Sequence, residues 1–533
     1  MEKAHVQEHS RTSASSTDAS DEKGRARQIE DVGVAADREK NAVDARGAGE
    51  IDTSGVDERK LLRKLDLALI PWLSFLYLLS FLDRTSIGNA KLYGLEKDLH
   101  INDSQYNIAL MIFFISYAIF EVPSNVFLKR LRPSIWLSLL MFLWGIMMTV
   151  QGLVHNYGGL LGMRWMLGLF EAGLFPGVNF YLSCWYKRSE FGIRAAIFFA
   201  AATVSGAFGG LLAAAIANMD GVAGKPGWAW IFILEGLITV IAGALSPFII
   251  QDFPDTAKFL TEPERAFIVK RLQSDNQFSA AGEDLKWKYI LKSLLDVKTW
   301  IAMLVYAGSD GPLYAFSLFL PSIISQLGFK ATPANLLTVP VYVFACIVTI
   351  AAGLYADRKG RRGIQNMVFL CVGAVGYIIL IVSRNATLSY IAVYLAAAGI
   401  YPNIPNTIAW VSNNVEGSYK RGVSLAMVIG FGNINGAVSS NVYRGQDKPW
   451  YTLGHGIVLM YIGIGLITSV IYYIVLRREN AARDRGDRDE IIKGVNDDPA
   501  TLNSRLAANG RFESVDDAQR EKGDEWSGYR YTL

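Results

Sequence analysis

Residues 164–186 read RWMLGLFEAGLFPGVNFYLSCWY, which places an arginine and a glutamate inside a long apolar run. The run extends over about residues 158–184, which exceeds the roughly 20 residues that a helix needs to span a bilayer. A charged side chain at membrane depth is costly unless it is paired or faces water, so it marks a functional site. This stretch therefore predicts a membrane-spanning helix that carries part of a site.

The rest of the chain repeats this apolar pattern. Of its 533 residues, 51% are hydrophobic and 19% are charged, whereas about 25% are charged in an ordinary soluble domain. So little polar surface could not cover twelve buried helices, and continuous rather than alternating apolar runs exclude a transmembrane barrel. We predict an all-α membrane protein with twelve transmembrane helices in two six-helix halves. The eleven other predicted spans are 65–84, 106–127, 136–154, 195–217, 228–250, 299–324, 335–355, 364–383, 388–411, 421–443 and 452–476.

A long charged connection divides the spans into two groups of six. It covers residues 251–298 and separates an N-terminal half at 61–250 from a C-terminal half at 299–476. The flanking segments 1–60 and 477–533 are hydrophilic and lack periodicity, so we expect two disordered cytoplasmic tails. The chain has neither a phosphate-binding loop nor the His/Cys spacing of a metal site. We therefore expect no enzymatic activity, no cofactor and no metal.

The short connections indicate how the chain crosses the membrane. With a cytoplasmic N-terminus, twelve lysines and arginines fall in inside loops and seven in outside loops, as the positive-inside rule requires. Both termini and residues 251–298 are then cytoplasmic. Two Asn-x-Ser/Thr sequences, at Asn102 and Asn385, fall on outside loops, where glycosylation can occur. The sequence predicts a multi-pass protein, which we assign to the plasma membrane.

One connection carries a family motif. Residues 353–362 read GLYADRKGRR between two predicted spans, and this pattern resembles the signature loop of the major facilitator superfamily. The resemblance covers about residues 60–480. The stretches FLDRTSIGNAKLYGLEKDL (81–99), FEVPSNVFLKR (120–130), RWMLGLFEAGLFPG (164–177) and GNINGAVSSNVYR (432–444) resemble its anion:cation symporter group, in particular the fungal allantoate permease-like branch.

This resemblance implies a function. It implies a secondary active transporter that takes up a small organic anion with protons by alternating access. The anion would be a monocarboxylate, a vitamin or a ureide, such as nicotinate or allantoate. We expect the chain to act as a monomer in the bilayer, with no nucleic acid partner. Two alternatives remain, a proton-antiport efflux carrier for a metabolite and a non-transporting membrane sensor or scaffold.

Charged residues in two predicted spans are the main candidates for the site. Arg164 and Glu171 share one helical face two turns, about 10 Å, apart, so each needs its own partner. Asp83 and Arg84 end the first predicted span, and Asp83 should lie at the depth of Arg164. An arginine can grip a carboxylate with a bidentate fork, and an acid can trade a proton. The resemblance implies that Asp83 and Glu171 carry protons and that Arg84 and Arg164 bind or gate the substrate.

The alternative for these charged residues is structural, namely interlocked helix ends or an ion pair at the outer surface. Glu121 lies near the cytoplasmic end of its span beside Pro123, where packing or gating is the favoured role. Asp310 lies in GSDGP, whose glycine and proline residues should interrupt the helix and let a polar cavity reach it.

The second half is rich in amides. Asn433 lies between glycines in GFGN, and the resemblance implies a substrate-contacting asparagine in that helix. Asn403, beside a proline in the tenth span, is a candidate for the transport pathway. Amides of this kind also join helices to one another.

The signature loop is the candidate gate. Asp357 lies where the eighth span reaches the cytoplasm, and cations follow it, among them Arg358 and Arg361. The carboxylate can cap a neighbouring helix or pair with these cations in one conformation only, which makes it a latch. The alternative is a basic loop that only sets topology, but that alternative explains neither the glycine nor the aspartate.

Overall fold

The computed structural model describes residues 55–274, 287–328, 331–443, 447, 450–493 and 509–533. The chain divides into two compact units, Met1–Val56 and Asp57–Leu533. All that follows concerns the second unit. The tail predicted at 1–60 lies outside the described residues as far as residue 54.

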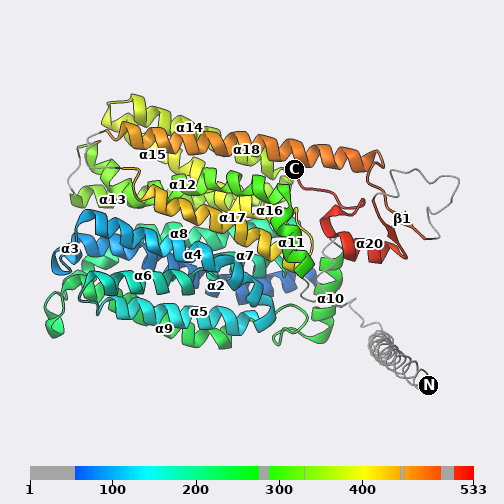
Figure 1. Ribbon diagram of the computed structural model, residues 1–533, viewed down its shortest axis with the longest axis horizontal. Helices are drawn as coiled ribbons and strands as arrows, with labels where there is room; N and C mark the ends of the chain where they lie inside the picture. Colours follow the sequence, from blue (N-terminus) through cyan, green and yellow to red (C-terminus); the bar gives the residue numbers. More distant parts are fainter. Residues whose placement is uncertain (1–54, 275–286, 329–330, 444–446, 448–449, 494–508) are drawn as a thin grey trace, which may run out of the picture. The chain divides into compact units, whose positions relative to one another are not determined.

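Figure 1 shows the spans of this unit lying side by side. The N-terminal half consists of α2 (Glu58–Leu92), α4 (Asp103–Leu131), α5 (Pro133–Gln151), the consecutive helices α6 (Tyr157–Glu171) and α7 (Leu174–Ser183), α8 (Arg188–Ala217) and α9 (Gly227–Ile249). Short turns of helix, α3 (Leu95–Asp98) and η1 (Val222–Gly224), lie in its connections.

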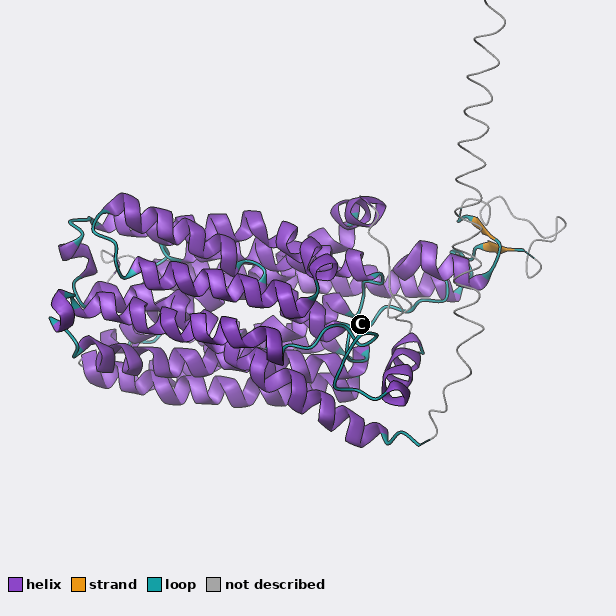
Figure 2. Cartoon of the chain, turned by 90° about the horizontal axis from the view of Figure 1, so that it is seen from below, coloured by secondary structure: helices purple, strands orange, loops and turns teal. Residues whose placement is uncertain are grey.

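The C-terminal half repeats this arrangement. It consists of α12 (Val297–Gln326), α13 (Ala331–Lys359), α14 (Arg362–Val382), the consecutive helices α15 (Ala386–Ile400) and α16 (Asn403–Ser412), α17 (Ser418–Ser439) and α18 (Thr452–Asp484). Between the halves lie α10 (Glu262–Gln273) and α11 (Trp287–Leu295), and after them come β1 (Ile491–Ile492), β2 (Arg511–Phe512), α20 (Val515–Lys522) and η4 (Gly523–Glu525). Figure 2 shows how strongly helix dominates, with the parallel pair β1 and β2 as the strands in view.

Ten helices in the described part of the chain are long and apolar enough to cross a membrane. The predicted span 158–184 is not among them, and it is divided into α6 and α7. The break falls at Gly173, where a Cβ atom would collide with Ser124 of α4. The span α12 is also not among the ten, since Ser309 and Asp310 lie at its polar centre. The predicted interruption at GSDGP is wrong, because α12 is continuous there.

Close helix packing holds each half together and joins the two. In the N-terminal half α5 packs along α9, and in the C-terminal half α14 packs against α15 and α18. A Cβ atom at Gly145 would lie 2.6 Å from the backbone nitrogen of Val240, so glycine permits the close approach of α5 and α9. Across the halves, α8 packs on α13 and α4 on α17.

The prediction of a disordered C-terminal tail is wrong for residues 509–533, here called the docked segment. Asp524 of this segment is fully buried, and its carboxylate lies 2.7 Å from Nζ of Lys420 and 3.4 Å from Nζ of Lys298. Burial alone would raise the pKa of Asp524, but the two lysines hold it below the ordinary value. Helix α18 also continues past residue 476, the predicted end of the last span.

Backbone contacts fix the rest of the docked segment to the ends of α16 and α18. The indole of Trp410 donates to the carbonyl oxygen of Thr532 at 2.9 Å, and the side-chain oxygen of Asn414 accepts from the Thr532 N–H at 2.7 Å. Arg483 donates to the carbonyl oxygen of Tyr529 at 2.7 Å. The segment therefore packs as part of the C-terminal half. Residues 494–508 of the predicted tail lie outside the described residues.

Candidate functional site

An ion pair between α2 and α6 lies at the heart of the candidate site. Arg84 and Glu171 are both buried, and Nη2 of Arg84 lies 2.6 Å from Oε1 of Glu171. Ser80, one turn before Arg84, donates its hydroxyl to the same oxygen at 2.7 Å. The second oxygen, Oε2, has no hydrogen-bond partner in the described structure. Glu171 thus holds the arginine with one oxygen and leaves the other able to accept a proton.

Arg164 lies near this pair but is not bound to it. It is 1% exposed, and Nε donates to the carbonyl oxygen of Ala109 at 3.4 Å. Its guanidinium lies 4.6 Å from the centre of the Phe113 ring, and that of Arg84 lies 5.5 Å from the same ring. Among the described residues Arg164 forms no ion pair, and Nη1 has no hydrogen-bond partner. The two arginines flank one aromatic ring, and between them they contact one carboxylate, that of Glu171.

A chain of hydrogen bonds joins Arg84 to the other half. Nη1 of Arg84 donates to the hydroxyl oxygen of Tyr314 on α12 at 2.6 Å. Tyr314 donates to Oδ1 of Asn433 on α17 at 2.6 Å, and Nδ2 of Asn433 donates to Glu121 on α4 at 3.3 Å. The structure therefore brings Arg84, Glu171 and Asn433 into one network. Glu121, expected to act in packing or gating, completes a contact between the halves.

The two pathway candidates lie in different surroundings. Asp310 is 2% exposed, and a Cβ atom on Gly432, next to Asn433, would lie 3.1 Å from its Oδ2. Asp310 thus borders the network from α12. Asn403 is fully buried and donates to the carbonyl oxygen of Gly399, one turn earlier in the chain. Its amide nitrogen therefore satisfies the local backbone, where α15 gives way to α16.

Asp83 faces a different helix from Arg84. It is fully buried, but its Oδ2 accepts from the hydroxyl of Thr239 on α9 at 3.0 Å. No ion pair joins Asp83 to Arg164 within the described residues. Consecutive residues on a helix point about 100° apart, and α2 turns Arg84 toward α6 and Asp83 toward α9.

The signature loop forms the predicted contact, but with different partners. Asp357 accepts from the backbone N–H of Ile193 on α8 at 2.7 Å and is paired with Arg362. A Cβ atom at Gly192 would collide with both of these side chains, so glycine permits the approach. Arg358 and Arg361 are exposed. The partner of Asp357 is therefore the buried Arg362 and not Arg361, and the contact joins the two halves.

Some members of the site were not predicted. Tyr314 lies four residues after Asp310 on the same helical face, a spacing that could have indicated it. Ser80 and Phe113 gave no signal, because apolar spans contain many such residues. In the described part of the chain no group of His, Cys, Asp and Glu side chains could hold a metal ion. Asn102 and Asn385 are exposed and cap the N-termini of α4 and α15.

Two helical halves in contact around buried ionic groups define a class of protein, the multi-pass membrane transporters. The family model described as Major Facilitator Superfamily matches residues 73–440, and the chain belongs to that superfamily. The fold class predicted from the sequence is thereby confirmed. The chain is accordingly a transporter of small molecules and not an enzyme.

Relatives of known name support this assignment. The chain is 37% identical over 451 residues to the MFS-type transporter cnsO of Penicillium expansum. This match covers 82% of the present chain and 87% of the relative. It is 32% identical over 447 residues to the high-affinity nicotinic acid transporter of Saccharomyces cerevisiae, covering 84% and 83%. The solved structure of the proton:xylose symporter XylE bound to 6-bromo-6-deoxy-D-glucose superposes with a TM-score of 0.61 at 13% identity, covering 76% of this chain and 96% of that one. At this identity the likeness concerns the fold alone.

Proposed function

We propose that this transporter takes up a small organic anion together with protons. The observation that carries the proposal is the charge balance around Phe113, where two buried guanidinium groups lie against one ring and only that of Arg84 is paired with a carboxylate. A buried charge without a partner is strongly unfavourable, so Arg164 is suited to hold an anion. An arginine binds a carboxylate through two parallel hydrogen bonds, which fixes its orientation.

Proton coupling follows from the Arg84–Glu171 pair. A proton that binds Glu171 removes the charge that holds Arg84, and Arg84 then becomes available to the substrate anion beside Arg164. Release of the proton restores the ion pair and expels the anion. Tyr314 and Asn433 connect Arg84 to the other half, so this exchange changes a contact on which the closure of the two halves depends.

The substrate class rests on kinship and on chemistry. One relative is named a high-affinity nicotinic acid transporter, and nicotinate is an aromatic monocarboxylate. Its carboxylate matches Arg164, and its ring can pack against aromatic side chains such as Phe113 and Tyr314. We place the chain in the plasma membrane as a monomer with both termini cytoplasmic. The end of the bundle that carries Asn102 and Asn385 is then the outside.

Reconstitution into liposomes tests this proposal. An inward proton gradient should drive accumulation of labelled nicotinate, and Arg164→Lys should abolish it, because lysine keeps the charge but lacks the fork. The control is Glu264→Gln, because the ion pair of Glu264 with Lys64 lies apart from the site. This variant should leave accumulation unchanged. Export of preloaded nicotinate in exchange for protons that move inward would identify an efflux carrier instead. Binding without any flux would identify a sensor.

A further inference from the structure

A second pair of buried acids lies in the N-terminal half, on the other side of α2 from the Arg84–Glu171 ion pair. Asp83 on α2 is 0% exposed and Glu235 on α9 is 1% exposed. Neither forms an ion pair in the described part of the chain. Oδ1 of Asp83 and both carboxyl oxygens of Glu235 have no hydrogen-bond partner there. An ionised carboxylate in such surroundings is strongly unfavourable.

The two acids face each other across the contact of α2 with α9. Thr239, which donates to Asp83, lies one turn after Glu235 on the same face of α9. Glu235 therefore lies one helical turn from the residue that binds Asp83, at the contact of α2 with α9. Two carboxyls that share a site cannot both be ionised, so one of them keeps a proton.

The neighbouring helices supply polar groups but no neutralising cation. Trp144 of α5 faces Asp83, and Gln151, two turns further on the same face of α5, is fully buried with neither side-chain polar atom partnered within the described residues. Helix α5 contains no titratable residue, and the titratable group beyond Asp83 is Glu171. Arg84 lies beyond Glu171, and the carboxylate of Glu171 already balances its charge. The acids are therefore neutralised by protons and not by a protein cation.

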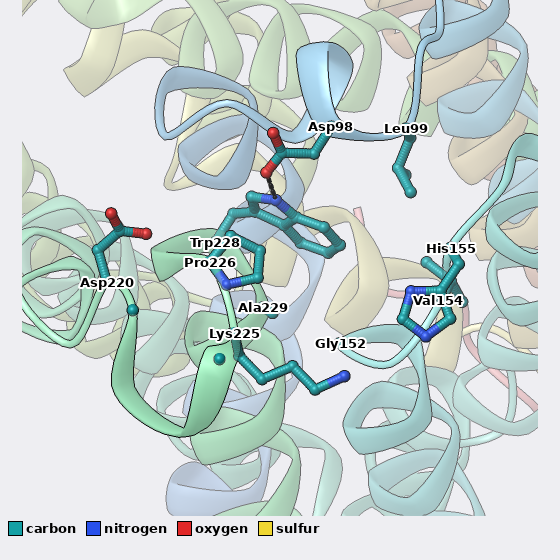
Figure 3. A pocket seen from close by; sticks show the side chains of 12 residues that line it. Asp98, Leu99, Gly152, Val154, His155, Asp220, Lys225, Pro226, Trp228 and Ala229 are labelled. Atoms are coloured by element: carbon teal, nitrogen blue, oxygen red, sulfur yellow. Dashed lines mark hydrogen bonds between the residues drawn. The ribbon is translucent and has the colours of Figure 1, made fainter.

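A pocket lies at the end of the bundle, on the same two helices as Glu235 and Gln151. It has a volume of about 490 Å³, and Gly152, Trp228 and Ala229 are among its lining residues. Figure 3 shows Asp98 over the ring of Trp228, to which a hydrogen bond of 2.8 Å joins it, with His155 on another side of the pocket. Gly152 directly follows Gln151, and Trp228 precedes Glu235 by two helical turns on the same face, about 10 Å along the helix. The pocket lining is thus two helical turns from Glu235.

We propose that Asp83 and Glu235 form a proton-storage site, filled from this pocket, that supplies Glu171. The inference rests on the proposed proton coupling and deepens it, because it separates the site that stores the proton from the site that binds the anion. The pair cycles between two bound protons and one shared proton. Passing one proton to Glu171 neutralises that residue and releases Arg84, and the pair then recovers a proton from the pocket.

Two measurements on the full-length protein test this site. In liposomes, Glu235→Gln should reduce proton-driven accumulation of labelled nicotinate at least tenfold while counterflow stays within about threefold, because counterflow needs no net proton movement. Glu235→Asp should restore accumulation, since it restores the acid. Val154→Trp, which fills the pocket, should slow accumulation at least threefold. Equal accumulation by wild type and Glu235→Gln would refute the proposal.

The second measurement does not depend on transport. Infrared spectra of purified protein near neutral pH should show a carboxylic acid C=O band that Glu235→Gln loses and that the control Glu264→Gln keeps. Identical bands in wild type and Glu235→Gln would overturn the storage site even if uptake is proton-driven. If the wild type shows the band but no proton-driven uptake, the stored proton is real and the proposed coupling is wrong.

Discussion

The ion pair between Arg84 and Glu171 makes a quantitative prediction for Glu171→Gln. Under the proposed coupling, one proton must bind Glu171 before Arg84 can turn from the carboxylate 2.6 Å away to the anion. One proton per anion means that affinity for nicotinate rises up to about tenfold for each pH unit of acidification, equal to about 1.4 kcal/mol. Over about two units the gain approaches roughly 100-fold.

Glutamine keeps the size of Glu171 and the contact with Ser80 but cannot be ionised. Its affinity should equal that of the fully protonated wild type and should not change with pH. Counterflow should persist and uphill accumulation should be lost, because no proton is released. The assay is equilibrium binding of labelled nicotinate across a pH series, with Glu264→Gln as the control that keeps the wild-type slope. A slope in Glu171→Gln equal to that of the wild type would show that the proton binds elsewhere.

Four other regions make predictions of their own. Arg164→Lys should weaken nicotinate binding at least tenfold although the charge is retained, since the fork is lost; wild-type affinity would make Arg164 structural. Asp357→Asn should slow transport severalfold and change affinity by less than about threefold, because the residue joins the halves away from the anion; a large loss of affinity would mean that the loop contacts substrate. Asp524→Asn should weaken docking of residues 509–533 by about 3 kcal/mol, seen as faster proteolysis there. Because the pKa of Asp524 is lowered in the folded state, its contribution is complete above the ordinary value of 3.8 and is lost only as the pH falls below it, so mild acid alone should not release the segment. Asn102→Gln and Asn385→Gln should each remove one glycan if their end of the bundle is outside. Glycosylation of a tag added at either terminus would instead show that the termini are outside.

The spans were predictable because length and apolarity alone decide whether a helix crosses a membrane. The partners inside the bundle were not. Asp83 and Arg84 are adjacent in sequence, and which of them faces α6 depends on the rotation of α2, which is set by the packing of α2 on its neighbours. Local sequence does not encode that rotation, so the expected match of Asp83 with Arg164 gave way to a contact with Thr239.

The docked segment shows a different limit. Its hydrophilic composition predicts disorder when the segment is considered alone. Its partners, among them Lys298, Lys420 and Arg483, lie at helix ends far away in the sequence. Charge complementarity between distant parts of a chain leaves no local pattern, whereas a motif marked Asp357 as a residue that caps a neighbouring helix or pairs with the cations that follow it.

The docked segment follows every span in the order of synthesis, so it leaves the ribosome after the bundle has been inserted. Until the segment arrives, Asp296 is the one carboxylate paired with Lys420 among the other described residues. Packing of the C-terminal half is therefore completed only after insertion. A premature stop codon that spares all the spans but removes residues 509–533 would leave an inserted bundle in which Lys298 and Lys420 lack the carboxylate of Asp524.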